Sequence, residues 1–339
     1  MVVRRILITF AALTLLAAAP AATANPYLPP KGKIFAGVTG GYDASSFARE
    51  TGSHPSVFQF FGGWNQTTSY MFAGARAARA RLMIHLSTVR GTTEQITPRG
   101  IARGAGDHYL LKLGQRIADY GGVTYIRLMA EMDGHWNAYC AYTASGRSKG
   151  PAYTTAQFRR AWKRTVLILR GGPLTTVDAN LHALHMPPVQ GAGASASLAR
   201  PRVAFLWVPQ VAGAPDTRAN SPSAYWPGAR YVDWVGTDFY SKFPNWSGLD
   251  RFFSGRTWRG KPFAFGEWAI WGRDDPAFVH RLFAWSRAHG HVRMLMYNQG
   301  KLTSGPFRLV HYPRSRSALA AELRSHGIAD FAPELLPQP

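Results

Sequence analysis

Cysteine is nearly absent from this 339-residue chain, in which Cys140 is the only one. No disulfide can therefore form within the chain, and the fold has to be stabilised by its apolar core rather than by covalent links. Eleven Trp, fourteen Tyr and nineteen Phe are enough to fill a substantial core and to leave aromatic rings for a surface cleft. We interpret Cys140 as a buried structural residue rather than a catalytic thiol.

Acidic residues are scarce: 18 Asp and Glu stand against 39 Lys and Arg, which gives a formal net charge of +21. Such a surplus draws a protein toward anionic polymers, among them acidic cell-wall polysaccharides. The basic residues are scattered, however, and this is also typical of charges spread over solvated helix faces. Electrostatic association with anionic wall polymers and a simply solvated surface both stay open, whereas the lack of a nucleic-acid fold signature argues against a nucleic-acid partner.

A long apolar run occurs only near the amino terminus, where Arg4 and Arg5 precede residues 6–19. A small-residue cleavage site follows, so residues 1–24 are predicted to be a signal peptide that is cleaved near Ala24-Asn25. The run is shorter than the roughly 20 residues that a membrane span needs. We therefore expect a secreted, extracellular protein without a transmembrane anchor.

Several motifs of other enzyme classes are missing from the sequence. It contains no G-x-S-x-G elbow of a serine hydrolase and no phosphate-binding loop of the G-x-x-x-x-G-K-[ST] type. The nearest approach to a zinc motif, His182 and His185, lacks further ligands, so no metal site is predicted. These absences favour a reaction that needs no cofactor.

Eight apolar segments alternate with helical patterns along the chain. They are rich in Val, Ile, Phe and Tyr, and most are apolar enough to be covered on both faces, which is typical of parallel strands. A doubly wound sheet usually has a Gly-rich phosphate turn after its first strand, and this chain lacks that spacing. The pattern therefore predicts the α/β class and a (β/α)8 (TIM) barrel. The eight predicted strands are residues 34–39, 56–61, 81–86, 124–132, 203–208, 231–239, 262–268 and 292–297.

Two helices have clear start signals. Thr154 suits the N-cap of a helix over residues 155–170, because Gln157 follows three residues on and an apolar stripe recurs at helical spacing. A second helix is predicted to begin at Asp275-Pro276, where an acidic cap precedes a proline at the first helical position.

The chain is predicted to form one large domain. Residues 25–332 suit a single barrel, which needs roughly 250 residues plus insertions. Residues 171–202 hold clusters of Gly, Ala, Pro and Ser and are longer than an ordinary connection, so we interpret them as an insertion. Residues 333–339 are rich in proline and are expected to form a loose tail.

Two glutamates stand out because each closes a predicted strand. Glu131 ends the fourth strand and Glu267 the seventh, at the carboxyl ends where active sites of this fold gather. Period-two alternation predicts that Arg127, Met129 and Glu131 share one face. Arg127 then belongs to a polar barrel mouth, or forms an ion pair that ties strands together. Two positioned carboxyl groups are what glycoside hydrolysis needs.

Aromatic residues follow both glutamates. Trp136 comes shortly after the first, and Trp268 and Trp271 come directly after the second. Because indole rings are large, flat and apolar with one polar edge, they suit the apolar faces of pyranose rings. Trp136, Trp268 and Trp271 are therefore predicted sugar contacts, with a core position as the equal alternative for Trp268. His135 is a further candidate contact.

Three segments carry a family resemblance. Residues 127–136 read Arg-Leu-Met-Ala-Glu-Met-Asp-Gly-His-Trp, residues 231–240 read Tyr-Val-Asp-Trp-Val-Gly-Thr-Asp-Phe-Tyr, and residues 261–267 read Lys-Pro-Phe-Ala-Phe-Gly-Glu. They resemble the acid/base strand, the sixth strand and the nucleophile strand of glycoside hydrolase family 26, the β-mannanase family. Three such segments in the right order make the resemblance specific.

This resemblance implies roles for individual residues. Glu131 takes the place of the general acid/base, Glu267 that of the nucleophile, and Tyr240 that of a hydroxyl partner of the nucleophile. The chain departs from the family pattern at Ala130, where the family has His, and at Asp133, where it usually has Asn. If it is ionised, Asp133 is expected to help keep the neighbouring acid protonated.

The sequence thus predicts a glycoside hydrolase that cleaves β-glycosidic bonds of a polysaccharide or oligosaccharide, in endo or exo fashion, by retaining double displacement. A β-mannan or a related β-glycan is the expected substrate. Two alternatives stay open: a non-catalytic carbohydrate- or cell-wall-binding barrel, and a lysozyme-like hydrolase of an anionic wall glycan. The predicted substrate-binding residues are Arg127, His135, Trp136, Tyr240, Trp268 and Trp271.

Overall fold

The computed structural model describes residues 25–40, 44–300, 304–325 and 327–335. The predicted signal peptide, residues 1–24, lies outside the described residues. Within the described ranges, no helix combines the length and the apolar character that crossing a bilayer requires.

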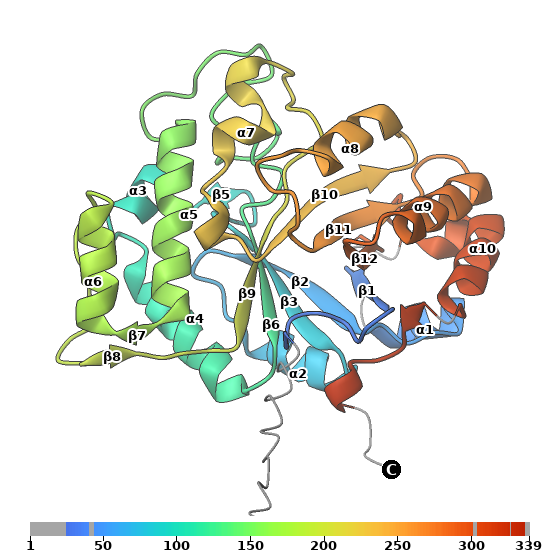
Figure 1. The fold of residues 1–339 in the computed structure, drawn as a ribbon, viewed down its shortest axis with the longest axis horizontal. Coiled ribbons are helices and arrows are strands. Elements are labelled where there is room, and N and C mark those ends of the chain that lie inside the picture. The colour runs from blue at the N-terminus through green and yellow to red at the C-terminus, as the bar shows by residue number, and fades with distance from the viewer. Residues whose placement is uncertain (1–24, 41–43, 301–303, 326, 336–339) are drawn as a thin grey trace, which may run out of the picture.

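Eight parallel strands of the described chain close into a barrel (Figure 1). Each strand pairs with the next one along the chain, and the first, β1, also pairs with the last, β12, so that the ring has no open edge. The predicted (β/α)8 barrel is confirmed. The barrel strands are β1 (Ile34–Thr39), β2 (Val57–Gly63), β3 (Arg81–Ser87), β6 (Thr124–Leu128), β9 (Val203–Trp207), β10 (Trp234–Tyr240), β11 (Phe263–Ala269) and β12 (Val292–Asn298).

The barrel interior is filled by side chains rather than open. Successive residues of a strand point to opposite faces, so alternate residues enter the interior and the others meet the helices. On β6, for example, Tyr125 joins the interior cluster and Ile126 joins the outer one. The interior cluster is made of large side chains that include Phe35, Met83, Leu206, Trp234 and Met294.

Helices surround the barrel, and two of them begin as predicted. The Thr154 hydroxyl accepts a hydrogen bond from the Gln157 backbone N–H at 3.2 Å, and the Asp275 carboxylate accepts one from Phe278 at 3.0 Å. Both caps satisfy backbone donors that the first helical turn leaves unpaired. The helices are α1 (Ala44–Thr51), α2 (Ser69–Ala77), α3 (Pro98–Ala102), α4 (Asp107–Tyr120), α5 (Thr155–Arg170), α6 (Leu174–Ala183), α7 (Pro222–Tyr225), α8 (Trp246–Phe253), α9 (Pro276–Ala288) and α10 (Pro313–Leu323).

The segment predicted as an insertion, residues 171–202, has structure of its own. It contains α6, and a two-stranded pair, β7 (Gly172–Pro173) and β8 (Ser197–Leu198), lies at its ends beside α5 (Figure 1). The buried Arg164 of α5 fixes its middle by donating to the Pro187 carbonyl oxygen at 2.8 Å. A second short pair, β4 (Val89–Arg90) and β5 (Thr93–Glu94), follows β3.

The carboxyl-terminal end of the described chain packs at the end of the barrel where the strands begin. A short strand, β13 (Ile328–Ala329), pairs with β1. In the segment predicted as a loose tail, residues 333–339, Glu334 forms an ion pair with Arg81 at 2.7 Å. The tail is therefore anchored at its start, and residues 336–339 lie outside the described residues.

Candidate active site

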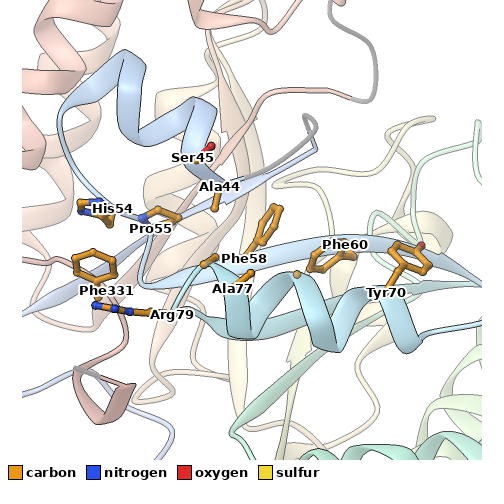
Figure 2. A pocket seen from close by; sticks show the side chains of 12 residues that line it. Ala44, Ser45, His54, Pro55, Phe58, Phe60, Tyr70, Ala77, Arg79 and Phe331 are labelled. Carbon is orange, nitrogen blue, oxygen red and sulfur yellow. The ribbon is translucent and has the colours of Figure 1, made fainter. Parts of the chain in front are cut away.

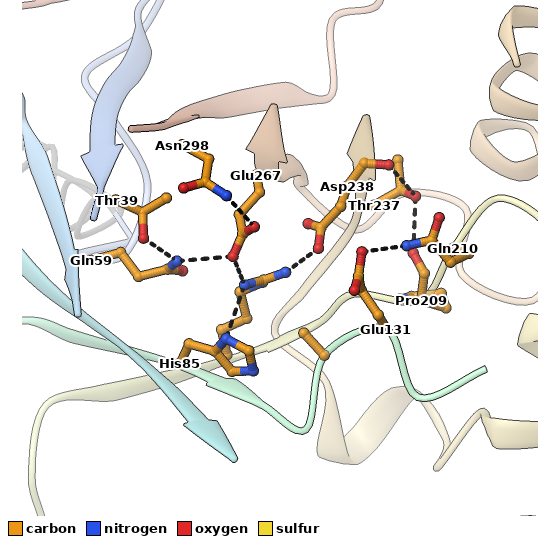
Figure 3. A network of polar contacts seen from close by, with 12 residues as sticks. Thr39, Gln59, His85, Glu131, Pro209, Gln210, Thr237, Asp238, Glu267 and Asn298 are labelled. Atoms are coloured by element: carbon orange, nitrogen blue, oxygen red, sulfur yellow. Dashed lines mark hydrogen bonds and ion pairs between the residues drawn. The ribbon is translucent and has the colours of Figure 1, made fainter. Parts of the chain in front are cut away.

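The carboxyl ends of the barrel strands bring a set of polar side chains together (Figure 3). Glu267 belongs to β11, the seventh barrel strand, and Glu131 lies three residues beyond β6, the fourth. In this fold, functional side chains gather at that end of the barrel. Glu267 thus lies on its predicted strand, whereas Glu131, predicted to end a strand, lies in the loop that follows it.

Glu267 is held by hydrogen-bond donors on both of its carboxylate oxygens. Its Oε1 accepts from Arg127 Nη1 at 2.5 Å and from Gln59 Nε2 at 3.4 Å. Its Oε2 accepts from the Tyr240 hydroxyl at 2.6 Å and from Asn298 Nδ2 at 2.8 Å. Four donors match the acceptor capacity of an ionised carboxylate and fix its orientation toward the barrel mouth. Tyr240 is therefore the partner of Glu267 that the resemblance implied.

Arg127 lies beneath the carboxylates, with its side chain 1% exposed. Its guanidinium pairs with both Glu267 and Asp238 and also contacts His85 Nδ1 at 3.3 Å. Burial alone would lower the pKa of Arg127, but the neighbouring Asp238 and Glu267 raise it, so the side chain stays charged. The prediction that Arg127 binds substrate is corrected here, because a buried guanidinium committed to two carboxylates positions them instead.

Asp238 adds a third carboxyl group to this cluster. It is buried on β10, and burial raises its pKa well above the usual value, with the charge of Glu267 acting in the same direction and Arg127 opposing. Asp238 was not predicted from the sequence. Asp238 lies two residues before Tyr240 on the same strand, so strand alternation, which places both on the inner face, was the signal that could have revealed it.

Glu131 reaches the site through an irregular backbone. The strand β6 ends at Leu128, and both Met129 (φ 41°) and Glu131 (φ 51°) adopt left-handed conformations. Met129 packs in the outer core cluster, whereas Ala130 packs in the interior one. The predicted alternation of Arg127, Met129 and Glu131 on one face is therefore wrong beyond Leu128. Left-handed backbone is costly for residues other than glycine and is concentrated at functional sites.

Two N–H donors hold the Glu131 carboxyl group, one on each oxygen, and the Asp238 carboxyl group hydrogen-bonds to it as well. Gln210 Nε2 lies 2.5 Å from Oε1, and the Trp136 indole N–H lies 2.8 Å from Oε2. Burial raises the pKa of Glu131, and the negative charge of Glu267 raises it further, against the effects of Arg127 and Trp136. A carboxyl group with a raised pKa keeps its proton at a pH where ordinary carboxyl groups have lost theirs, which suits a general acid.

Asp133 was expected to act on Glu131 only if it is ionised, and its surroundings disfavour the ionised form. It is fully buried, and burial raises its pKa well above the usual value, so the neutral form is favoured. Its Oδ1 accepts a hydrogen bond from the Gln210 backbone N–H at 2.9 Å. Asp133 thus positions Gln210, and through it the amide that contacts Glu131.

The aromatic residues divide into two groups. Trp136 is 53% exposed at the barrel mouth and packs against the exposed His135, with ring centroids 5.2 Å apart. Trp271 is half-buried and packs edge-on against Tyr240 at 5.8 Å. Trp268 is a correction: it is 1% exposed and packs among core aromatics, because the alternation that turns Glu267 inward turns its neighbour outward, toward the helices.

Three amide side chains complete the site and were missed by the sequence analysis. Gln59 of β2 and Asn298 of β12 both donate to Glu267, and Gln210 follows β9. Gln59 is itself fixed by the Thr39 hydroxyl of β1 at 2.6 Å. Asn298 ends β12 and Gln210 lies three residues beyond β9, whereas Gln59 lies inside β2. A search of strand ends for amide residues would have found Asn298 and Gln210 but not Gln59.

A separate cavity of about 690 Å³ lies away from the carboxylates, between α1 and α2 (Figure 2). The outward-facing rings of Phe58 and Phe60 line it, together with Tyr70. It contains none of the acidic residues described above. Within the described ranges, no cluster of three or more His, Cys, Asp and Glu side chains is arranged to hold a metal ion.

The fold and the site together define a (β/α)8 barrel with paired carboxyl groups at the ends of its fourth and seventh strands. The protein GH26A from a Muricauda species shares this fold, with a TM-score of 0.57 and 16% identity over 88% of this chain and 92% of its own. A GH26 β-mannanase from Bacteroides ovatus matches with a TM-score of 0.55 and 16% identity over 88% and 91%.

A mannanase from Bacillus subtilis matches in the same way, with a TM-score of 0.54 and 14% identity over 89% of this chain and 88% of its own. No protein-family model and no curated protein matches the sequence. At these identities the similarity shows a shared fold, extending over nearly the whole length of both chains.

Proposed function

We propose that this protein is a retaining glycoside hydrolase that cleaves β-glycosidic bonds of a polysaccharide, with Glu267 as nucleophile and Glu131 as general acid/base. One observation carries the proposal. A carboxylate held by four donors and a second carboxyl group with a raised pKa share one barrel mouth. Glycoside hydrolysis needs this division of roles between two carboxyl groups.

In the first step, Oε2 or Oε1 of Glu267 attacks the anomeric carbon while Glu131 donates its proton to the leaving glycosidic oxygen. The bond from the anomeric carbon to that oxygen breaks, and a covalent glycosyl-enzyme forms. Arg127, Tyr240 and Asn298 keep the attacking carboxylate oriented. Because the carboxylate is already oriented in the folded protein, it loses little further entropy on reaching the transition state.

In the second step, the ionised Glu131 takes a proton from water, and the resulting oxygen nucleophile displaces Glu267 from the anomeric carbon. The two N–H donors on Glu131, from Gln210 and Trp136, stabilise its ionised form between these steps. Two displacements at one carbon restore the original anomeric configuration. The product is therefore expected to retain the β configuration.

The resemblance in three segments and the shared fold with β-mannanase structures support membership of glycoside hydrolase family 26 and β-mannan as the first substrate to test. Residues 1–24 have the features of a secretion signal and support an extracellular place of action. Expression in a bacterial host, with amino-terminal sequencing of the medium fraction, tests the predicted cleavage near Ala24-Asn25.

The experiment for the reaction combines substitution with chemical rescue. Glu131→Ala and Glu267→Ala should each lower sugar release from β-mannan by at least about 10³-fold. With a dinitrophenyl β-manno-oligosaccharide, whose leaving group needs no proton, azide should restore turnover by attacking in place of activated water in Glu131→Ala and in place of the carboxylate in Glu267→Ala. Rescue of Glu131→Ala should yield a β-glycosyl azide and rescue of Glu267→Ala an α-glycosyl azide. The exposed Asp119→Asn is the matched control and should behave as wild type. Unchanged turnover in either Glu variant would contradict the proposal.

A further inference from the structure

We propose that the polysaccharide carries carboxylate groups, which Arg90 and Lys242 bind on two sides of the nucleophile. This inference rests on the proposed function and adds the chemical class of its substrate. Both side chains are exposed, and each lies beside aromatic rings next to residues that hold Glu267.

Arg90 lines a cavity of about 460 Å³ at the carboxyl end of β2. Gln59, which donates to Glu267, lines the same cavity, as does the half-buried Phe61 two residues further along the inner face of β2. The guanidinium and a hydrogen-bond partner of the nucleophile therefore line one cavity. Gly63 makes this placement possible, because a Cβ at that position would lie 2.4 Å from the Val89 carbonyl oxygen of the strand that carries Arg90.

Lys242 lies on the other side, two residues beyond Tyr240. Its ammonium group is 4.8 Å from the centre of the Trp271 ring and 5.6 Å from that of Phe243. Trp271 packs against Tyr240, whose hydroxyl donates to Glu267, and Phe243 is 64% exposed. A continuous aromatic surface thus leads from the nucleophile outward to a cation.

Three other cations among the described residues already have partners. Arg127 is paired with Asp238 and Glu267, Arg308 pairs with Glu50 at 3.3 Å, and Lys149 donates to the Asn137 carbonyl oxygen at 2.8 Å. In contrast, no ion pair joins Arg90 or Lys242 to an acidic residue among the described ranges. Their charge is therefore available to a ligand.

A polysaccharide with acidic groups fits this arrangement. Its rings pack on aromatic side chains while its carboxylates reach the cations at the edge of those rings. The guanidinium of Arg90 matches a carboxylate with two parallel hydrogen bonds, and the ammonium of Lys242 acts as a point charge. The net charge of +21 favours approach of such a polyanion over a neutral glycan.

The test compares substrates that differ in the carboxylate alone. Oligosaccharides of β-1,4-linked mannuronate and of β-1,4-linked mannose share linkage and ring configuration, so their ratio of kcat/KM isolates a carboxylate of the backbone. Xylan oligosaccharides with glucuronosyl branches, compared with the same compounds after reduction of each branch carboxyl group to the alcohol, isolate a carboxylate on a side chain. Wild type should prefer at least one acidic member about tenfold or more over its neutral counterpart.

The variants Arg90→Gln and Lys242→Gln should each lower kcat/KM on the preferred acidic substrate by about 3- to 10-fold, mainly through KM, and leave the neutral substrate within about twofold. Arg256→Gln is the matched control, because Arg256 is also exposed but precedes β11, at the opposite end of the barrel. Arg256→Gln should leave the acidic-to-neutral ratio of kcat/KM unchanged for both pairs of substrates. Loss of the preference at about 0.5 M NaCl should accompany these results.

Equal turnover of acidic and neutral members, or a preference that survives both Gln substitutions, overturns the anionic-substrate inference while the hydrolase stands. If no substrate is cleaved, affinity electrophoresis of Glu131→Gln in gels containing mannuronan or mannan decides. If mannuronan retards the protein and Arg90→Gln and Lys242→Gln abolish this retardation, the inference of anion binding is supported. The proposed hydrolase has then failed separately. No retardation, or retardation that the two variants retain, overturns the inference.

Discussion

Arg127 Nη1 lies 2.5 Å from Oε1 of Glu267, inside a barrel where the arginine is 1% exposed. The same guanidinium also pairs with Asp238, so one buried cation neutralises part of the charge of two acidic side chains. Buried ion pairs of this kind rarely add net stability over apolar packing, but breaking one leaves an uncompensated charge. The ion pair between Arg127 and Glu267 therefore affects both the orientation of the nucleophile and the stability of the barrel.

Arg127→Met is expected to lower the free energy of unfolding by about 3–5 kcal/mol, because Asp238 and Glu267 lose their buried counter-charge. Arg127→Lys should lose less stability but should still lower kcat, since one ammonium group cannot span two carboxylates. Urea unfolding and initial rates measure both effects. A Met variant as stable as wild type would contradict this account of the cluster.

The pH dependence should report the proton on Glu131. Because burial and Glu267 raise its pKa, kcat/KM should be high below that pKa and should fall as the pH rises through it. Gln210→Leu removes a donor to the ionised carboxyl group and should move this alkaline fall to higher pH. A fall at unchanged pH in the Leu variant would show that Gln210 does not tune the acid.

Asp133→Asn should be more stable than wild type at high pH, and the difference in free energy of unfolding between the two should grow as the pH rises. The pKa of Asp133 is raised in the folded state, so its favourable contribution is complete below the ordinary Asp pKa, about 3.9, and is lost as the pH rises through the folded value. An amide keeps the oxygen that accepts from Gln210 and carries no charge to bury. Thermal unfolding between pH 4 and 8 measures the difference, with the exposed Asp119→Asn as control. A constant difference across that range would refute the buried-acid interpretation.

Two tryptophans close in sequence to the glutamates should behave differently. Trp268→Ala should cost about 3–5 kcal/mol of stability, because it empties a core position, whereas Trp136→Ala should spare stability and lower kcat/KM. The variant Trp136→Ala lacks both the exposed ring and the N–H that donates to Glu131. Comparable stability losses in the two variants would contradict the division between core and site.

The sequence was enough to predict the barrel, the strand that carries Glu267 and the strand that Glu131 follows, because eight apolar segments and alternating helices leave few other topologies. Local signals also located α5, whose cap uses Thr154 as expected. The strand β6 ended earlier than predicted, at Leu128. Periodicity gives no warning of left-handed backbone at Met129 and Glu131, since that conformation depends on surrounding contacts.

The partners of the glutamates were harder to predict. Gln59, Gln210 and Asn298 come from strands far apart in sequence, and only closure of the barrel brings their amides onto the carboxyl groups. Asp133 illustrates a different limit. Its type suggested a negative charge, but burial decides its protonation, and burial is a property of the fold.

Covalent labelling tests the central claim most directly. A 2-deoxy-2-fluoro-β-mannosyl fluoride slows the second displacement, so the proposed glycosyl-enzyme should accumulate, and peptide mass spectrometry should locate one added sugar on Glu267. Where the sugar of the fluoride does not fit the site, the corresponding glucosyl or uronyl fluoride replaces it. Labelling of Glu267 in wild type, and its loss in Glu267→Gln, is the predicted result. Turnover of the natural substrate with no label, or with the label on another residue, would contradict the assignment of the nucleophile.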